Sequence, residues 1–216
     1  MAIIRTSQDL ASALQMLIKQ EPRFGDLLES YGQPALREAP ATLESLLAII
    51  TEQFLSLSAG AAIWGRVRAH LGTVTTATLL ACSPETLVAL GLSRAKAKSF
   101  HAVAAAWQAN EIDLDAEAEQ VRKQLLKIWG VGPWTVDVFL LTAFGHGDAW
   151  PGGDVALQHA VHDFLGLPSR PSAREMEIIG AAWRPHRAAA SRLLWAHYRA
   201  LKGKRPKPLH RIDKGG

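Results

Sequence analysis

The chain has 216 residues, of which 48% are hydrophobic and 20% charged, and its formal net charge is +4. This composition is typical of a globular protein that buries its core in one domain or in two small lobes. A single cysteine, Cys82, excludes a disulfide framework and a four-cysteine iron–sulfur cluster. No apolar run approaches the roughly 18 residues of a transmembrane helix. The first residues also lack the features of a signal peptide, so we expect an intracellular protein with no membrane partner.

Most of the chain shows the apolar spacing of amphipathic helices, and little of it alternates as a strand does. In the first half this spacing predicts helices over residues 7–19, 22–31, 42–50, 59–71 and 84–91. In the second half it predicts helices over 93–107, from Asp115 to a turn at 130–132, directly after that turn, over 154–166, from Ser172, and over 185–201. We therefore expect an all-α protein of about ten helices, in two lobes or in one irregular bundle.

The turn Gly130-Val131-Gly132 joins two of these predicted helices. Open backbone amides at the start of a helix favour an anion such as a phosphate, although a Gly-rich turn can equally be a purely structural link between packed helices. Further along, Asp154 follows Gly152-Gly153 and precedes an apolar run, which suits a carboxylate at the entry to a buried helix. A phosphate site beside a positioned carboxylate favours an enzyme that acts on nucleic acid.

Two motifs carry a resemblance to a known family: Gly-Val-Gly-Pro-Trp-Thr at 130–135 and Pro-Gly-Gly-Asp-Val-Ala-Leu at 151–157. They resemble the helix-hairpin-helix DNA glycosylases with a Gly/Pro-rich loop and a catalytic Asp (HhH-GPD), most of all the 3-methyladenine DNA glycosylase II type. Further similar stretches are the minor-groove loop and next helix at 49–67, the Gly-Leu-Ser-x-x-Lys element at 91–98, and the final helix at 183–195. The resemblance implies a two-lobed all-α fold with the active-site cleft between the lobes.

The same resemblance implies a domain organisation. A helical glycosylase domain would cover residues 1–201, with its helix-hairpin-helix at about 117–144. The basic, Pro- and Gly-rich residues 202–216 would form a flexible tail.

The resemblance also implies roles for individual residues. Asp154 would be the catalytic carboxylate, and Phe54 would be a wedge that fills the gap left by a flipped nucleotide. Trp134 and Trp150 would line the base pocket, where an aromatic face can stack on a cationic base. The expected DNA-binding residues are Gly130, Val131, Gly132, Trp134, Thr135, Gln53 and Phe54. The carbonyls of Leu126, Ile128 and Val131 would hold a structural Na⁺ or K⁺, and no other cofactor is expected.

The predicted activity is that of a monofunctional DNA glycosylase of base excision repair. Relatives that also cut the DNA backbone use a lysine two residues after the second hairpin glycine, where this chain has Trp134, which cannot form a Schiff base. We expect Asp154 and water to hydrolyse the N-glycosidic bond of alkylated purines, 3-methyladenine among them. The partner would be damaged double-stranded DNA, bound by a monomer in a bacterial-type cytoplasm and nucleoid.

Two alternatives stay open. One is a glycosylase for other damaged or deaminated bases, and the other is a non-catalytic DNA-binding helix-hairpin-helix module. The intact Asp154 loop argues against the module, because an anion facing a polyanion does not help binding.

Several polar and aromatic residues have less specific patterns. Asp148 is a second candidate carboxylate, and Asp137 is expected to orient or cap. Lys96 and Lys98 either contact phosphate or form a solvated helix face. The helical spacing of Trp64, Trp107 and Trp195 favours core positions.

Overall fold

The computed structural model describes residues 3–204 of the chain, and this part folds into twelve α-helices with one isolated β-bridge between Ile3 and His146. The helices are α1 (Ser7–Gln20), α2 (Arg23–Tyr31), α3 (Leu43–Glu52), α4 (Leu57–Leu71), α5 (Thr76–Ala81), α6 (Pro84–Ala89), α7 (Arg94–Gln108), α8 (Ala118–Leu125), α9 (Pro133–Ala143), α10 (Val155–Leu165), α11 (Ala173–Ala181) and α12 (Arg187–Lys204). None of the helices in this range is long and apolar enough to cross a membrane.

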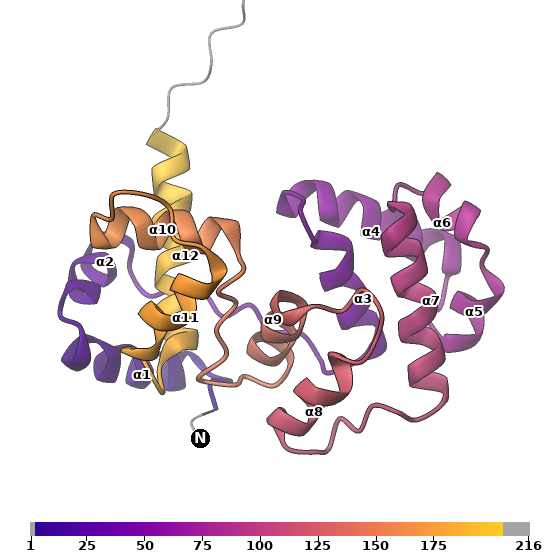
Figure 1. The fold of residues 1–216 in the computed structure, drawn as a ribbon, viewed down its shortest axis with the longest axis horizontal. Coiled ribbons are helices and arrows are strands. Elements are labelled where there is room, and N and C mark those ends of the chain that lie inside the picture. Colours follow the sequence, from indigo (N-terminus) through magenta and orange to yellow (C-terminus); the bar gives the residue numbers. More distant parts are fainter. Residues whose placement is uncertain (1–2, 205–216) are drawn as a thin grey trace, which may run out of the picture.

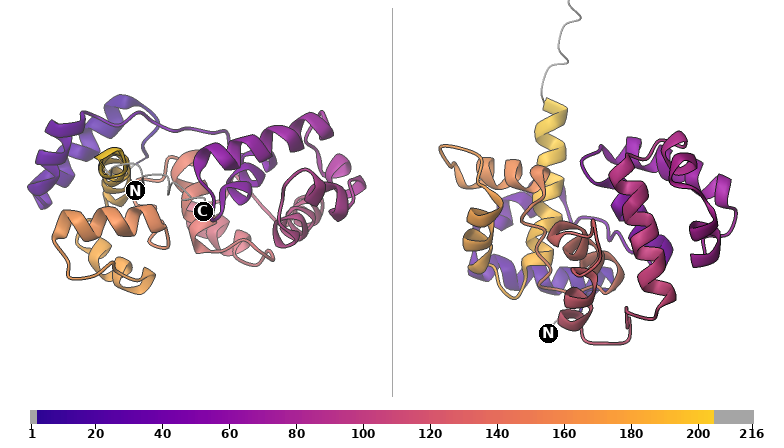
Figure 2. Two further views of the ribbon diagram at one scale, coloured as in Figure 1. Left: turned by 90° about the horizontal axis from the view of Figure 1, so that it is seen from above. Right: turned by 45° about the vertical axis from the view of Figure 1, so that its right-hand side comes forward.

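The helices form two lobes, as expected (Figure 1). One lobe combines the two ends of the described chain: α12 runs through its middle and packs against α1, α2 and α10. In the other lobe α7 packs against α3, α5 and α6, and α9 packs against α3 and α8 (Figure 2). The expected all-α class is confirmed, and the helix–turn–helix formed by α8 and α9 faces the first lobe.

Helix starts follow the capping residues in the sequence. The Ser93 side chain accepts from the Lys96 N–H at the start of α7, and Ser172 and Glu175 form a capping box at the start of α11. At α1 the cap is Thr6, and Asp9 completes a capping box with it.

Two expected boundaries were wrong, and one helix was missed. The helix expected to start at Asp115 begins at Ala118, because the Asp115 N–H bonds to the Asp113 carboxylate in a local turn. Helix α5 was not predicted, since six residues are too few to establish a helical period. The last helix extends to Lys204, three residues into the expected tail, and the rest of that tail, 205–216, lies outside the described residues.

Candidate active site and nucleic-acid interface

The hairpin turn is fixed by glycine and by apolar packing. Gly130 has φ +80°, a left-handed conformation that favours glycine, and a Cβ there would lie 1.9 Å from the Ser99 Oγ of α7. Ile128 and Val131 bury their side chains in the core beneath the turn. The turn therefore rests directly on α7, and only a residue without a side chain fits at position 130.

The open amides of the hairpin lie at the start of α9. The Val131 N–H donates to the Ile128 carbonyl at 3.1 Å, which corrects the expectation that it is available to a phosphate. The N–H groups of Gly132, Trp134 and Thr135 donate to no other group within residues 3–204. These three amides begin a helix without a side-chain cap, an arrangement that suits an anion such as a phosphate.

Asp154 lies at the N-terminus of α10, where three N–H groups converge on its carboxylate. The Leu157 backbone N–H donates to Oδ1 at 2.8 Å, and the Trp134 indole N–H donates to Oδ2 at 2.8 Å. The Trp195 indole N–H reaches Oδ1 at 3.3 Å. The half-buried carboxylate is thus held in one orientation by the first turns of α9 and α10 and by α12.

Trp195 was expected in the core but is a residue of the site. It is half-buried and lies 41 positions from Asp154, so its helical spacing alone could not reveal the contact. The contact depends on α12 packing along α10, whose first turn is capped by Asp154, and this packing is seen only in the structure.

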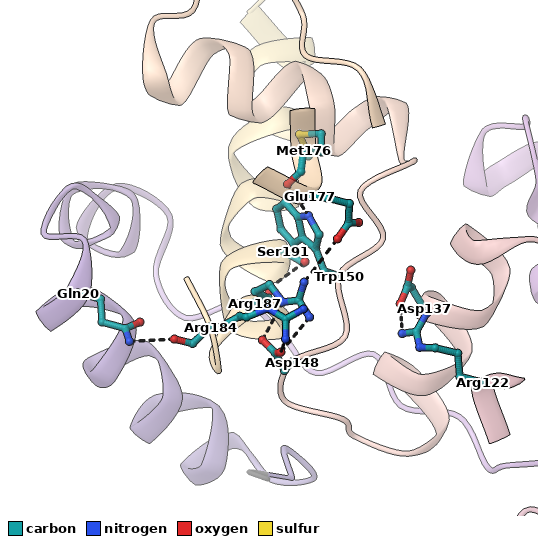
Figure 3. Close-up of polar contacts among 10 residues, drawn as sticks. All are labelled: Gln20, Arg122, Asp137, Asp148, Trp150, Met176, Glu177, Arg184, Arg187 and Ser191. Atoms are coloured by element: carbon teal, nitrogen blue, oxygen red, sulfur yellow. Dashed lines mark hydrogen bonds and ion pairs between the residues drawn. The ribbon is translucent and has the colours of Figure 1, made fainter. Parts of the chain in front are cut away.

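Trp150, by contrast, was expected at the base pocket, and the structure places it in the core. Its side chain is 2% exposed, its indole N–H donates to the Met176 carbonyl at 2.9 Å (Figure 3), and its ring packs edge-on against Trp183. A Cβ on Gly180 would lie 2.7 Å from the indole nitrogen. Trp150 thus exposes almost none of its surface, although it lies in the wall of the inter-lobe cavity described below. Trp134 is the expected pocket tryptophan that contacts Asp154.

The two other carboxylates near the site are neutralised by arginines. Asp148 is 4% exposed and accepts two hydrogen bonds of 2.8 Å from Arg187 (Figure 3). Asp137 is 6% exposed and paired with Arg122; burial raises its pKa, and the Arg122 contact only partly opposes this. Asp154 forms no ion pair with any described residue, so its charge is not compensated.

A cavity of about 330 Å³ lies between the lobes. Its walls include Pro133 and Asp137 from α9, Glu177 from α11 and Arg187 from α12. Neither Asp154 nor Trp134 is part of this lining. The cavity is an open space between the lobes, and the candidate catalytic carboxylate lies outside its lining.

The expected minor-groove loop follows α3 and lies against the hairpin. The Phe54 side chain is fully exposed at the tip, and its backbone has φ +58°. A non-glycine residue in this conformation costs about 1–3 kcal/mol and needs support from its surroundings. Gln53 supplies part of that support: its side-chain amide donates to the Gly130 carbonyl at 3.2 Å and to the Thr135 Oγ1 at 2.8 Å.

The carbonyls expected to hold a monovalent cation differ in availability. The Ile128 carbonyl accepts the Val131 N–H, whereas those of Leu126 and Val131 accept no backbone N–H in the described chain. Oxygen ligands suit Na⁺ and K⁺, so these two open carbonyls fit such an ion. Residues 3–204 contain no cluster of His, Cys, Asp and Glu that could hold a metal ion.

Lys96 and Lys98, which either contact phosphate or lie on a solvated helix face by their sequence pattern, differ in burial. Lys96 is 9% exposed and binds the carbonyls of Thr51 and Gln53, so it neither contacts phosphate nor lies on a solvated face. Lys98 is exposed, with its Nζ 4.2 Å from the centre of the Trp129 ring beside the hairpin.

A helical hairpin with open amides, an oriented and uncompensated carboxylate, and an exposed aromatic loop together define a helix-hairpin-helix protein of the DNA-repair class. Residues 47–185 match the HhH-GPD superfamily base excision DNA repair proteins, and the chain belongs to this family. It is 27% identical to the alkylbase DNA glycosidase-like protein mag2 of Schizosaccharomyces pombe, over 87% of this chain and 93% of that protein. It is 35% identical to the probable bifunctional transcriptional activator/DNA repair enzyme AlkA of Mycobacterium tuberculosis, over 49% of this chain but only 21% of that protein.

Solved structures share the fold over most of the chain. The DNA-3-methyladenine glycosidase of Bacillus halodurans superposes with a TM-score of 0.73 at 28% identity, covering 89% of this chain and 91% of that one. The 3-methyladenine DNA glycosylase Mag1 of Schizosaccharomyces pombe, in complex with abasic DNA, superposes with a TM-score of 0.79 at 23% identity. That match covers 85% of this chain and 95% of Mag1, and at this identity it establishes the fold alone.

Proposed function

We propose that the protein is a monofunctional DNA glycosylase that flips an alkylated purine out of duplex DNA and hydrolyses its N-glycosidic bond. The observation that carries this proposal is the Asp154 carboxylate, aimed by two indole N–H groups and one amide and left without a cationic partner. Similarity to a 3-methyladenine glycosidase over nearly the whole chain supports the substrate class.

The first step is to take the base out of the stack, which costs a few kcal/mol. Insertion of Phe54 from the minor groove would offset that cost by filling the gap. The open amides of Gly132, Trp134 and Thr135 would hold a phosphate of the same strand. The Phe54 loop and the hairpin lie next to each other, because the Gln53 side chain, one residue before Phe54, donates a hydrogen bond to the Gly130 carbonyl of the hairpin.

The second step breaks the bond between C1′ and the base nitrogen. The base leaves with the electron pair, which neutralises the positive charge of an alkylated purine, so little acid assistance is needed. The sugar passes through an oxocarbenium-like state, which the Asp154 carboxylate stabilises more than the ground state. Water then bonds to C1′ and releases a proton.

Trp134 would contribute both to binding the base and to orienting Asp154. Its indole N–H orients Asp154 while its half-buried ring is available to stack on a cationic base. It occupies the position of the lyase lysine, so the reaction ends at an abasic site. In this proposal the protein acts as a monomer on the cell's damaged DNA, and Leu126 and Val131 would hold Na⁺ or K⁺, which would strengthen the phosphate contact.

The test is a base-release assay on duplex DNA carrying a panel of lesions: 3-methyladenine, 7-methylguanine, 1-methyladenine, ethenoadenine and hypoxanthine. Released bases are identified by chromatography and mass spectrometry. We expect 3-methyladenine to be released by the wild type. Absence of release of any base, with DNA binding intact, would support a non-catalytic module instead.

A further inference from the structure

Lys96 is a buried cation bound to backbone carbonyls. Its side chain is 9% exposed, and its ammonium lies 2.8 Å from the Thr51 carbonyl and 2.6 Å from the Gln53 carbonyl. No carboxylate of the described chain lies within ion-pair distance of it. Burial lowers its pKa, so the charged form depends on these two carbonyls. The carbonyls lie at the C-terminus of α3, where the helix dipole favours a positive charge.

The residue that Lys96 binds is also tied to the hairpin. The Gln53 carbonyl accepts from Lys96, while the Gln53 side chain donates to the Gly130 carbonyl and the Thr135 hydroxyl. The next residue is Phe54, with its left-handed backbone and fully exposed ring. The loop tip is therefore held from two sides immediately before the aromatic side chain.

Helix α7 contacts both the end of α3 and the hairpin turn. Ser99 lies three residues after Lys96, on the same side of the helix, and its Oγ fills the space where Gly130 would carry a Cβ. One helix face thus binds the end of α3 through Lys96 and the hairpin turn through Ser99.

We propose that Lys96 is a positioning residue that fixes the Phe54 loop relative to the hairpin, so that insertion into the duplex and phosphate binding occur together. This inference rests on the proposed function. Without the ammonium, the strained loop can relax, and inserting Phe54 then requires the loop to be ordered again on binding. The loss falls on duplex DNA, where a stack has to be opened, and not on single strands.

The experiment compares Lys96→Met, which keeps length and apolar volume but removes the charge, with Lys19→Met on the exposed face of α1. Excision is measured on duplex and single-stranded DNA carrying the same methylated base. For Lys96→Met we expect kcat/KM to fall about tenfold or more on the duplex and less than about threefold on the single strand. Lys19→Met should match the wild type on both. Equal losses on the two substrates, or no loss, would overturn the proposal.

A double-mutant cycle with Phe54→Ala tests whether Lys96 acts through the wedge. The double variant should lose no more duplex activity than Phe54→Ala alone, because the side chain to be positioned is already gone. If the double variant instead loses the product of the two single-variant fold-losses, Lys96 does not act through Phe54. Lys96→Gln, which is too short to reach both carbonyls, should repeat the pattern of Lys96→Met. Thermal unfolding of both Lys96 variants below 25 °C would show a general structural role and overturn the proposal.

A binding assay separates this inference from the proposed function. Affinities are measured for duplex and single-stranded DNA with a tetrahydrofuran abasic analogue, which needs no base release. Lys96→Met should weaken duplex binding selectively by about tenfold. If the wild type releases no base, the glycosylase proposal fails. A loss of affinity by Lys96→Met for duplex DNA alone would still support the positioning role. An equal loss of affinity for duplex and single-stranded DNA would overturn it.

Discussion

Replacing Asp154 by Asn separates the catalytic role proposed for this residue from its role as a helix cap. Three N–H groups converge on the carboxylate: Leu157 and Trp195 on Oδ1, and Trp134 on Oδ2. An Asn can place its carbonyl at Oδ1 and keep the first two bonds. Its NH₂ group then faces the Trp134 N–H, donor against donor.

The expected loss of stability is small and the expected loss of activity is large. One unpaired donor in a half-buried position costs about 1 kcal/mol, at the lower end of the range for buried groups. In a domain of this size that lowers Tm by about 2–4 °C. Removing the charge that faces the oxocarbenium-like state should slow excision by about 10²–10³-fold, because electrostatic groups of this kind contribute about 3–4 kcal/mol.

The assay is single-turnover release of 3-methyladenine from duplex DNA, together with a melting curve and an affinity for abasic DNA. Affinity should stay equal or rise, since a negative charge facing the phosphates is removed. The matched control is Asp9→Asn, which alters a capping carboxylate of α1, a helix that contributes no residue to the candidate site, and should leave excision unchanged. Excision by Asp154→Asn at the wild-type rate would refute the assignment.

Further predictions test the neighbours of Asp154, the wedge, the missing lyase step and the pH response. Trp195→Phe should lower kcat about 3–10-fold by removing one hydrogen bond to Asp154, whereas Trp107→Phe should not. Phe54→Ala should reduce binding of duplex lesions more than excision from single strands; equal effects would exclude the wedge. Borohydride should trap no covalent adduct with abasic DNA, because Trp134 offers no amine, and a trapped adduct would contradict hydrolysis by water alone. Burial lowers the pKa of His146, so its neutral form contributes stability above pH 6.5 that is lost as the pH falls. Urea unfolding between about pH 7.5 and 5.5 should show this decrease. His146→Asn should reduce it, and the remainder comes from His186, whose pKa burial also lowers.

The parts of the site that are local in sequence could be predicted. The Gly130 turn, the helix after it and the capping position of Asp154 each follow from residues a few positions apart. Glycine tolerates the left-handed turn, and a carboxylate before an apolar run caps a helix. Even there, the sequence could not predict which amide N–H groups are free to bind a phosphate, because the Val131 N–H donates to the Ile128 carbonyl inside the turn.

The parts that depend on packing between helices could not be predicted. Trp195 reaches Asp154 across 41 positions, and Lys96 reaches the Thr51 carbonyl across 45. An apolar spacing indicates that a side chain faces inward, but not whether its polar atom finds a partner in the core or in the site. The same limit explains Trp150, which lies close to Asp154 in sequence yet binds the Met176 carbonyl in the core.

The partners of the three carboxylates favour Asp154 as the functional one independently of any motif. Asp148 and Asp137 are buried, and each is compensated by an arginine, as a buried charge requires if it is to serve the fold. An arginine at Asp154 would cancel the field that a developing positive charge on the sugar needs. Neutral indole and amide N–H groups instead fix the orientation of the carboxylate and leave its charge in place. A catalytic carboxylate needs donors that orient it without cancelling its charge, and the donors around Asp154 are of this kind. A purely structural helix cap has no such requirement.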